Sequence, residues 1–153
     1  MELFILRHGQ AAFQAARDQD RQLTPRGQEE VHLSVSAALA ELRGVQKILV
    51  SPYVRAQQTA ALAAEYLPDI SRETEVLLTP EAKLAQLCQM LHKRKESSLL
   101  LVSHQPLVGQ LVNWLCGLAP GRYSMGTAAL ACIDTELLEA QLGDLRWLRH
   151  PGE

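Results

Sequence analysis

Short, continuously apolar runs alternate along the chain with longer segments in which apolar residues recur every three or four positions. The first run is Leu3 to Leu6, and two others lie within residues 47–51 and 99–103. Each run is too short for a helix, and its lack of polar alternation is typical of a strand buried on both faces of a sheet. We therefore expect three buried strands separated by helices.

Helical periodicity marks the segments between these runs. Thr24 and Pro25 suit the N-cap and first position of a helix, and Gly44 fits just beyond its end. A second helix is expected from Ala56 to Leu67 and stops at Pro68, because proline cannot continue a helix. Both helices present one apolar face and should pack against the sheet.

The second half of the chain predicts two more helices and further strands. Thr79-Pro80 repeats the cap-and-proline combination, so a third helix is expected to begin there, after a short edge strand near residues 76–78. A fourth helix follows residues 99–103 and ends near Gly117. Residues 127–134 and 144–149 read as two strands, which we expect to form an antiparallel hairpin at one sheet edge.

This alternation of strands and helices predicts an α/β fold with a mostly parallel central sheet. The length of 153 residues suits one domain with a substantial core, and the sequence contains no internal repeat or linker. We therefore expect a single domain over residues 1–153. The segment from residue 11 to residue 22 is polar and mixed, and it reads as a loop.

Composition narrows the classes of partner. The formal net charge of −2 creates no field that would recruit nucleic acid or an anionic membrane, and the few aromatic residues argue against a base-stacking platform. We expect no leader, since no basic-then-apolar stretch precedes the first strand, and no apolar run reaches the roughly 20 residues that span a bilayer. We expect neither nucleic acid nor membrane as a partner, and a cytoplasmic location.

The cysteines support a reducing compartment. Cys88, Cys116 and Cys132 are odd in number and far apart, which fits neither a disulfide framework nor a zinc site. The five histidines show no metal-ligand spacing, and the sequence has no glycine-rich phosphate loop. We therefore expect no metal and no cofactor.

Residues suited to anion chemistry follow each of the three buried strands. Arg7 and His8 follow the first, Arg55 comes shortly after the second at a helix start, and His104 follows the third. Each has an ordinary structural explanation when taken alone. Together they predict a site, because ligands of open α/β sheets bind outside the carboxyl ends of the strands. A cation at a helix N-terminus also implies a nearby anion.

Phosphoryl transfer is the chemistry that suits this set. Two converging guanidinium groups bind phosphate or carboxylate, and the charge of a phosphoryl group, spread over three oxygens, makes it the better fit. An imidazole beside them can act as a nucleophile, and burial and neighbouring positive charge would keep His8 neutral. His104 would bind phosphoryl oxygens, and Gln105 beside it is a further candidate for phosphate binding.

With these residues in place, the sequence resembles the histidine phosphatase superfamily, which also contains the phosphoglycerate mutases. Arg7-His8-Gly9 resembles its first signature, residues 51–59 its second motif, and Val102-Ser103-His104 its third. Leu23-Thr24-x-x-Gly27 resembles the segment that opens its first helix. The resemblance implies a three-layer α/β/α sandwich and a phosphate pocket of Arg7, Arg55 and His104. It also implies His8 as the phosphorylated nucleophile and no metal.

The short chain and the absence of cap insertions most resemble the SixA-type protein phosphohistidine phosphatases of this superfamily. That resemblance implies a His-phosphorylated phosphotransfer protein as substrate and inorganic phosphate as product. The sequence departs from larger phosphomonoesterases, in which an acidic residue in mid-chain acts as general acid. A phosphohistidine needs no strong acid, because its P–N bond is labile and the imidazole that leaves accepts a proton near neutral pH.

Two alternatives stay open at the level of sequence. A small-molecule phosphomonoesterase would need a general acid, for which Glu81 is the nearest candidate. The same residue could instead be a first-turn glutamate favoured by the helix dipole. A non-catalytic phosphate-binding module is the other alternative, and the intact His8 beside Arg7 argues against it.

Overall fold

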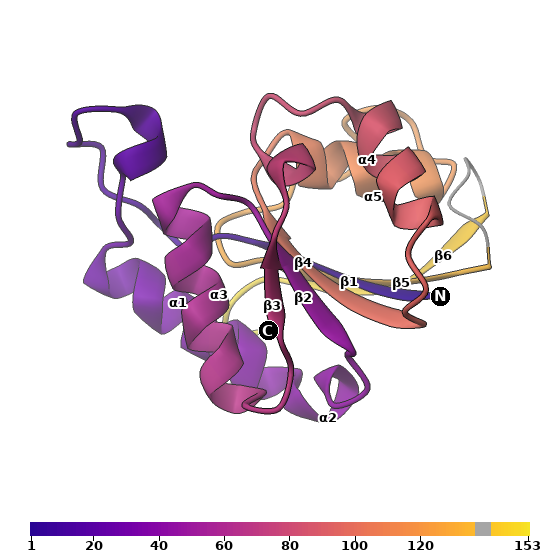
Figure 1. Ribbon diagram of the computed structural model, residues 1–153, viewed down its shortest axis with the longest axis horizontal. Helices are drawn as coiled ribbons and strands as arrows, with labels where there is room; N and C mark the ends of the chain where they lie inside the picture. Colours follow the sequence, from indigo (N-terminus) through magenta and orange to yellow (C-terminus); the bar gives the residue numbers. More distant parts are fainter. Residues whose placement is uncertain (137–141) are drawn as a thin grey trace.

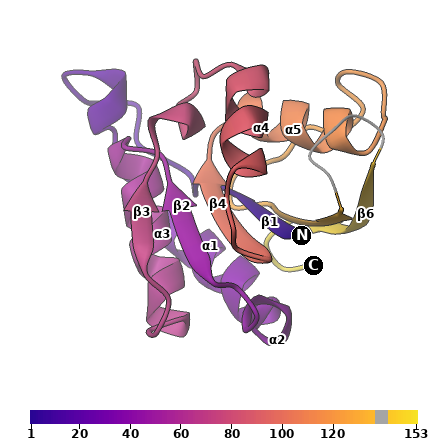
Figure 2. The ribbon, with the colours of Figure 1, turned by 45° about the vertical axis from the view of Figure 1, so that its right-hand side comes forward.

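The computed structural model describes residues 1–136 and 142–153 and shows a sheet between two layers of helices (Figures 1 and 2). Within this part of the chain, the strands are β1 (Glu2–Arg7), β2 (Lys47–Val50), β3 (Arg72–Thr74), β4 (Ser98–Ser103), β5 (Leu130–Thr135) and β6 (Gly143–Arg149). Helices α1 (Pro25–Ala37), α2 (Leu39–Leu42) and α3 (Val54–Tyr66) cover one face, and α4 (Leu84–His92) and α5 (Leu107–Leu115) cover the other.

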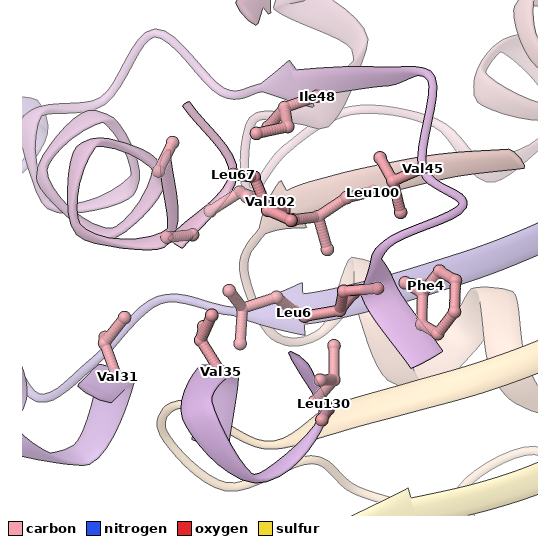
Figure 3. Packing of buried hydrophobic residues seen from close by; sticks show 14 of the residues in the cluster. Phe4, Leu6, Val31, Val35, Val45, Ile48, Leu67, Leu100, Val102 and Leu130 are labelled. Carbon is pink, nitrogen blue, oxygen red and sulfur yellow. The ribbon is translucent and has the colours of Figure 1, made fainter. Parts of the chain in front are cut away.

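Strand β1 is buried from both sides, as its continuous apolar run predicts. Its side chains alternate between two separate clusters of core residues. Leu3 and Ile5 pack with residues of α4 and α5, whereas Phe4 and Leu6 pack with residues of α1 and α3. Figure 3 shows part of the second cluster, with Phe4 and Leu6 of β1 among its labelled side chains. The two clusters account for the three-layer α/β/α sandwich that the sequence predicts.

The order of the strands is β3-β2-β4-β1-β5-β6. Strands β3, β2, β4 and β1 pair in parallel, whereas β5 pairs antiparallel with both β1 and β6. The expected antiparallel hairpin at one edge of the sheet is therefore confirmed. Of the connection between its strands, residues 137–141 lie outside the described residues.

The register of the parallel strands brings three chain segments to one edge of the sheet. Arg7 at the end of β1 pairs with Ser103 at the end of β4, and Val50 at the end of β2 pairs with Val102. The residues that follow these three strands must therefore lie beside one another.

Two sequence predictions about the segment before α4 are wrong. The expected helix start at Thr79-Pro80 is a turn, in which the Ala82 N–H donates to the carbonyl of Thr79, and α4 begins only at Leu84. The edge strand expected at residues 76–78 is the 3-10 helix η2 (Val76–Leu78), and the edge strand is β3 instead. The combination of a capping residue and proline is a local signal that also occurs in turns, so it could not distinguish a helix start from a turn.

The first helix begins as predicted but is interrupted. The Thr24 hydroxyl accepts a hydrogen bond from the Gly27 N–H at 3.0 Å, so Thr24 is the N-cap of α1. The predicted single helix breaks at Ala38 into α1 and α2, and the apolar face nevertheless stays buried at Ala38 and Leu42. The described helices include none that is both long enough and apolar enough to cross a bilayer.

Gly9 and Gly27 approach each other closely where the chain leaves β1 and meets the first turn of α1. A Cβ atom on Gly9 would lie 2.4 Å from the Gly27 carbonyl oxygen, and one on Gly27 would lie 2.0 Å from the Gln10 carbonyl oxygen. Both distances are far below van der Waals contact, and backbone atoms cannot rotate away. The backbone of Gly27 therefore occupies the space that a side chain at position 9 would need.

Replacing Gly27 with alanine should therefore lower the free energy of unfolding by about 2 kcal/mol or more, the range of overpacking in a closed site. Gly44→Ala is the matched control, since a Cβ atom there has no neighbour within 4 Å. It should change the free energy by less than about 0.5 kcal/mol. Urea denaturation of both variants measures the difference, and equal stabilities would contradict the packing argument.

Candidate active site

His8 lies directly after β1, and its ring is fixed in one tautomer. Its Nδ1 lies 2.7 Å from the carbonyl oxygen of Gly9. A carbonyl can only accept, so Nδ1 carries the proton and Nε2 carries the lone pair. The Gly9 N–H in turn donates to the hydroxyl of Thr59 at 3.2 Å, which anchors this carbonyl group to α3. The ring therefore presents an unprotonated Nε2.

Arg55 reaches His8 from the first turn of α3. Its Nε–H donates to Nε2 of His8 at 3.3 Å. The two terminal nitrogens of its guanidinium group donate to Asp18, one to the backbone carbonyl at 2.8 Å and one to the carboxylate at 3.2 Å. The sequence argument predicted that an arginine at this helix start would bind an anionic ligand. In the described structure Arg55 pairs with the carboxylate of Asp18, and its phosphate-binding role stays a prediction.

Arg7 is held at the end of β1 with part of its guanidinium group unused. One terminal nitrogen donates to the carbonyl of Met125 at 2.9 Å. Its Nε is buried and has no hydrogen-bond partner within the described part of the chain. Burial and the positive charge of Arg55 both lower the pKa of Arg7, against an opposing contribution from Glu30, and both arginines line the same cavity. An anion between them would relieve both costs.

His104 follows β4 and faces His8, with 5.1 Å between the centres of the two rings. Its Nε2 lies 2.7 Å from the Ser51 hydroxyl oxygen, and its ring packs edge-to-face with the Tyr53 ring, with 5.1 Å between the two centres. Its Nδ1 is buried and finds no partner among the residues that the structure describes. A phosphoryl oxygen would satisfy this atom if the Ser51 hydroxyl donates to Nε2 and Nδ1 carries the proton.

Both histidines are neutral at physiological pH. Burial lowers the pKa of His8 from 6.5 to about 4, and the charges of Arg55, Arg7 and Arg21 add to the effect against one opposing hydrogen bond to Gly9. Burial likewise lowers the pKa of His104 to about 2, with smaller contributions from His8 and Arg55. The expected neutral state of His8 is thus confirmed, with burial as the larger cause.

The two histidines and the two arginines described above line one cavity of about 330 Å³ at the edge of the sheet. Arg7, His8, Arg55, His104 and Gln105, the five residues predicted from the sequence, all lie in its wall. The side-chain oxygen of Gln105 accepts from the Gly109 N–H at 3.0 Å, so this end of the amide supports α5. Its phosphate-binding role stays a prediction.

Sequence reasoning missed four contributors. Arg21 and Phe13, from the loop after β1, also line the cavity, and Arg21 lies over the Phe13 ring. Ser51 orients His104, and Asp18 holds Arg55. Ser51 lies within a quoted motif, so the motif could have identified it. The loop residues carry no such signal, because their positions depend on how residues 11–22 fold back.

Carboxylates stay outside this wall in the described part of the protein. Asp18 lines a neighbouring hollow instead. Glu81 is exposed and accepts a hydrogen bond from the Tyr53 hydroxyl at 2.8 Å. Since α4 begins three residues later, Glu81 is not the first-turn helix residue that the sequence suggested. Within residues 1–136 and 142–153, no cluster of three or more His, Cys, Asp or Glu side chains could hold a metal ion.

Comparison with known proteins shows which family and which relatives this chain resembles. Residues 3–79 match the family described as the histidine phosphatase superfamily (branch 1). The phosphohistidine phosphatase SixA of Escherichia coli is 35% identical, over 99% of this chain and 94% of that protein. The SixA homolog of Haemophilus influenzae is 34% identical, over 76% of this chain and 78% of that protein.

A solved structure agrees with these sequences. The protein histidine phosphatase SixA complexed with tungstate superposes with a TM-score of 0.85 and 35% identity, over 99% of this chain and 97% of the other. The predicted phosphoglycerate mutase-like α/β architecture is thereby confirmed.

The low pKa values of His8 and His104 make stability depend on pH. Below the ordinary histidine pKa of 6.5 the unfolded chain takes up protons that the folded chain does not, so the free energy of unfolding must fall with falling pH. Each ring contributes a slope of up to about 1.4 kcal/mol per pH unit between its two pKa values. Chemical denaturation between pH 7 and pH 5, above the range where most carboxylates titrate, measures this slope.

The variant His8→Asn should reduce the slope, because its side chain does not titrate. The matched control is His92→Asn, at an exposed position on the last turn of α4. It should keep the slope of the parent protein. A free energy that stays constant from pH 7 to pH 5 would show that neither buried ring resists protonation.

Proposed function

The chain belongs to the histidine phosphatase superfamily, and from this premise we propose that it is a phosphohistidine phosphatase with His8 as its nucleophile. The similarity to two phosphohistidine phosphatases along most of the chain supports the activity. The unprotonated Nε2 of His8, which faces the cavity cations, supports the role of this residue.

In the first step, the incoming phosphoryl group takes over the Arg55 Nε–H, which donates to Nε2 of His8 without substrate, and the freed lone pair of Nε2 attacks the phosphorus atom of the substrate phosphohistidine. A P–N bond forms to His8 while the P–N bond to the substrate imidazole breaks, and the nitrogen that leaves takes a proton from solvent. The carbonyl of Gly9 accepts from Nδ1–H and so stabilises the positive charge that develops on the His8 ring.

In the second step, a water molecule attacks the phosphorus atom of phosphorylated His8. The P–N bond breaks, inorganic phosphate leaves and Nε2 regains its lone pair. Arg7, Arg55 and His104 bind the phosphoryl oxygens in both steps, where the unused Nε of Arg7 and Nδ1 of His104 supply donors. Arg21, a third arginine in the wall, adds positive charge for the dianion.

The lack of a carboxylate in the described cavity wall carries the substrate assignment. An alkoxide is a poor leaving group and needs a general acid, whereas an imidazole leaves with a proton that it accepts easily near neutral pH. The wall is therefore suited to a P–N substrate and unsuited to an alkyl phosphate ester. Glu81 in particular is bonded to the Tyr53 hydroxyl.

The substrate we propose is a His-phosphorylated protein, such as a phosphotransfer domain. The names of the two relatives support phosphohistidine as the bond that is cleaved. The small-molecule esterase alternative would need Glu81 to reach the leaving group. A non-catalytic phosphate-binding module would not need an unprotonated Nε2 on His8, so the fixed tautomer argues against that alternative. A cytoplasmic location and a role in signal transduction stay predictions.

The covalent intermediate gives a direct test. Incubation with a ³²P-phosphohistidine protein, followed by rapid denaturation in base, should leave label on His8 that is stable in base and lost in acid. His8→Ala should carry no label and should lose roughly 10⁴-fold or more in turnover. Unchanged circular dichroism and the surface variant His92→Ala serve as controls. Full turnover by His8→Ala would rule out this mechanism.

The role of Glu81 separates the two enzymatic readings. Glu81→Gln should leave phosphohistidine hydrolysis within about twofold of the parent rate, because the imidazole does not require a carboxylic acid. If Glu81 were a general acid for esters, the same change would slow alkyl phosphate hydrolysis by about 10²–10⁴-fold. Efficient hydrolysis of a sugar phosphate, lost in this variant, would support the small-molecule reading instead.

A further inference from the structure

Arg55 has a long side chain that must be held in one conformation to be useful at His8. It starts on α3 and its side chain is 6% exposed, whereas that of Asp18 is 54% exposed. A buried guanidinium group needs both a counter-charge and partners for its donors. Asp18 supplies both, because it accepts from the two terminal nitrogens through two different oxygens.

Asp18 is itself braced from the other side. The terminal nitrogen Nη1 of Arg21 donates to the second carboxylate oxygen of Asp18 at 3.1 Å. The Nε of Arg21 donates to the carbonyl of Ala12 at 2.7 Å, and its guanidinium group lies 5.3 Å from the centre of the Phe13 ring. Asp18 therefore links Arg55 on α3 to the loop of residues 11–22.

The direction of these bonds determines which edge of Arg55 faces the reaction. Asp18 accepts one hydrogen bond from each terminal nitrogen of Arg55, and the Arg55 Nε–H donates to Nε2 of His8. The edge of the guanidinium group that includes Nε is therefore turned toward the position where phosphorus would sit. Because Asp18 is not part of the described cavity wall, its carboxylate leaves the phosphoryl space free.

We propose that Asp18 is a positioning residue for Arg55: it holds the terminal nitrogens so that the Nε edge is aimed at the phosphoryl group on its way to His8. The proposal rests on the proposed phosphate-binding role of Arg55. It assigns a function to the loop after β1, which the catalytic motifs do not include. A competing arrangement, in which Asp18 displaces the phosphoryl group from Arg55, predicts the opposite response to mutation.

Asp18→Asn removes the charge at nearly constant volume and is the informative variant. Asp20→Asn is its matched control, since Asp20 lies in the same 3-10 turn, η1 (Asp18–Asp20), and pairs only with the exposed Arg17 in the described structure. Asp18→Asn should lower kcat for phosphoramidate, a small P–N substrate, by about tenfold, as misplaced catalytic groups do. Asp20→Asn should stay within about twofold of the parent.

Tungstate binding by calorimetry provides a readout that is independent of turnover. Asp18→Asn should weaken tungstate binding by about tenfold, because one misaligned charge-assisted contact accounts for that much. In an Arg55→Ala background the same change should have no further effect, since there is nothing left to position. This coupling distinguishes positioning of Arg55 from a general loss of loop stability.

Three results would overturn the proposal. Faster turnover or tighter tungstate binding in Asp18→Asn would show that the carboxylate competes with phosphate. Equal losses in Asp18→Asn and Asp20→Asn would show that only the fold of the loop matters. A full loss in the Arg55→Ala background would show that Asp18 acts through another group. If the parent protein binds tungstate but does not cleave phosphohistidine, the proposed function is wrong. The tungstate-binding measurements on the Asp18→Asn variant still test the positioning role of Asp18 in that case.

Discussion

Gly9 and Gly27 approach each other so closely that neither position has space for a side chain, and this contact joins the end of β1 to the first turn of α1. The backbone of Gly9 also donates to Thr59 on α3 and accepts from the Nδ1–H of His8. The position of a single carbonyl group thus depends on packing between two helices and a strand. Through that carbonyl, the packing decides which nitrogen of His8 carries the lone pair.

Electrostatics in the cavity follow from an uneven distribution of charge. Three guanidinium groups converge where two imidazoles stay neutral, and the described carboxylates nearest to them stay outside the wall: Asp18 is bound to Arg55, Glu81 to Tyr53, and Glu30 to Thr127. Such a site has surplus positive charge without substrate, which favours a dianion and disfavours neutral ligands. The same surplus adds to burial, the larger cause, in lowering the pKa of His8. Positive charge therefore favours both the binding of a dianion and the neutral state of His8.

The sequence predicted the parts that depend on buried strands. Apolar runs located β1, β2 and β4, and parallel pairing then required Arg7, His8, Arg55 and His104 to converge. It failed where a short segment has two local solutions, as at Thr79-Pro80, where a turn and a helix start share the same residues. It also missed Asp18 and Arg21, because loop residues acquire their roles only from contacts distant in sequence. Periodicity holds no information about such contacts.

The position of β1 in the sheet has a consequence for how the chain folds during synthesis. Among the described strands β1 comes first in the sequence, yet its neighbours are β4 and β5, and the amino group of Met1 donates to the carbonyl of Thr135. On the ribosome, residues 3–6 therefore stay unpaired until residues 98–103 have been made, and the second edge waits for residues 130–135. Contacts so far apart in sequence form slowly. Residues 3–6 thus lack both sheet partners while the intervening chain is made, and His8 reaches the environment of its cavity only after β4 has been synthesised.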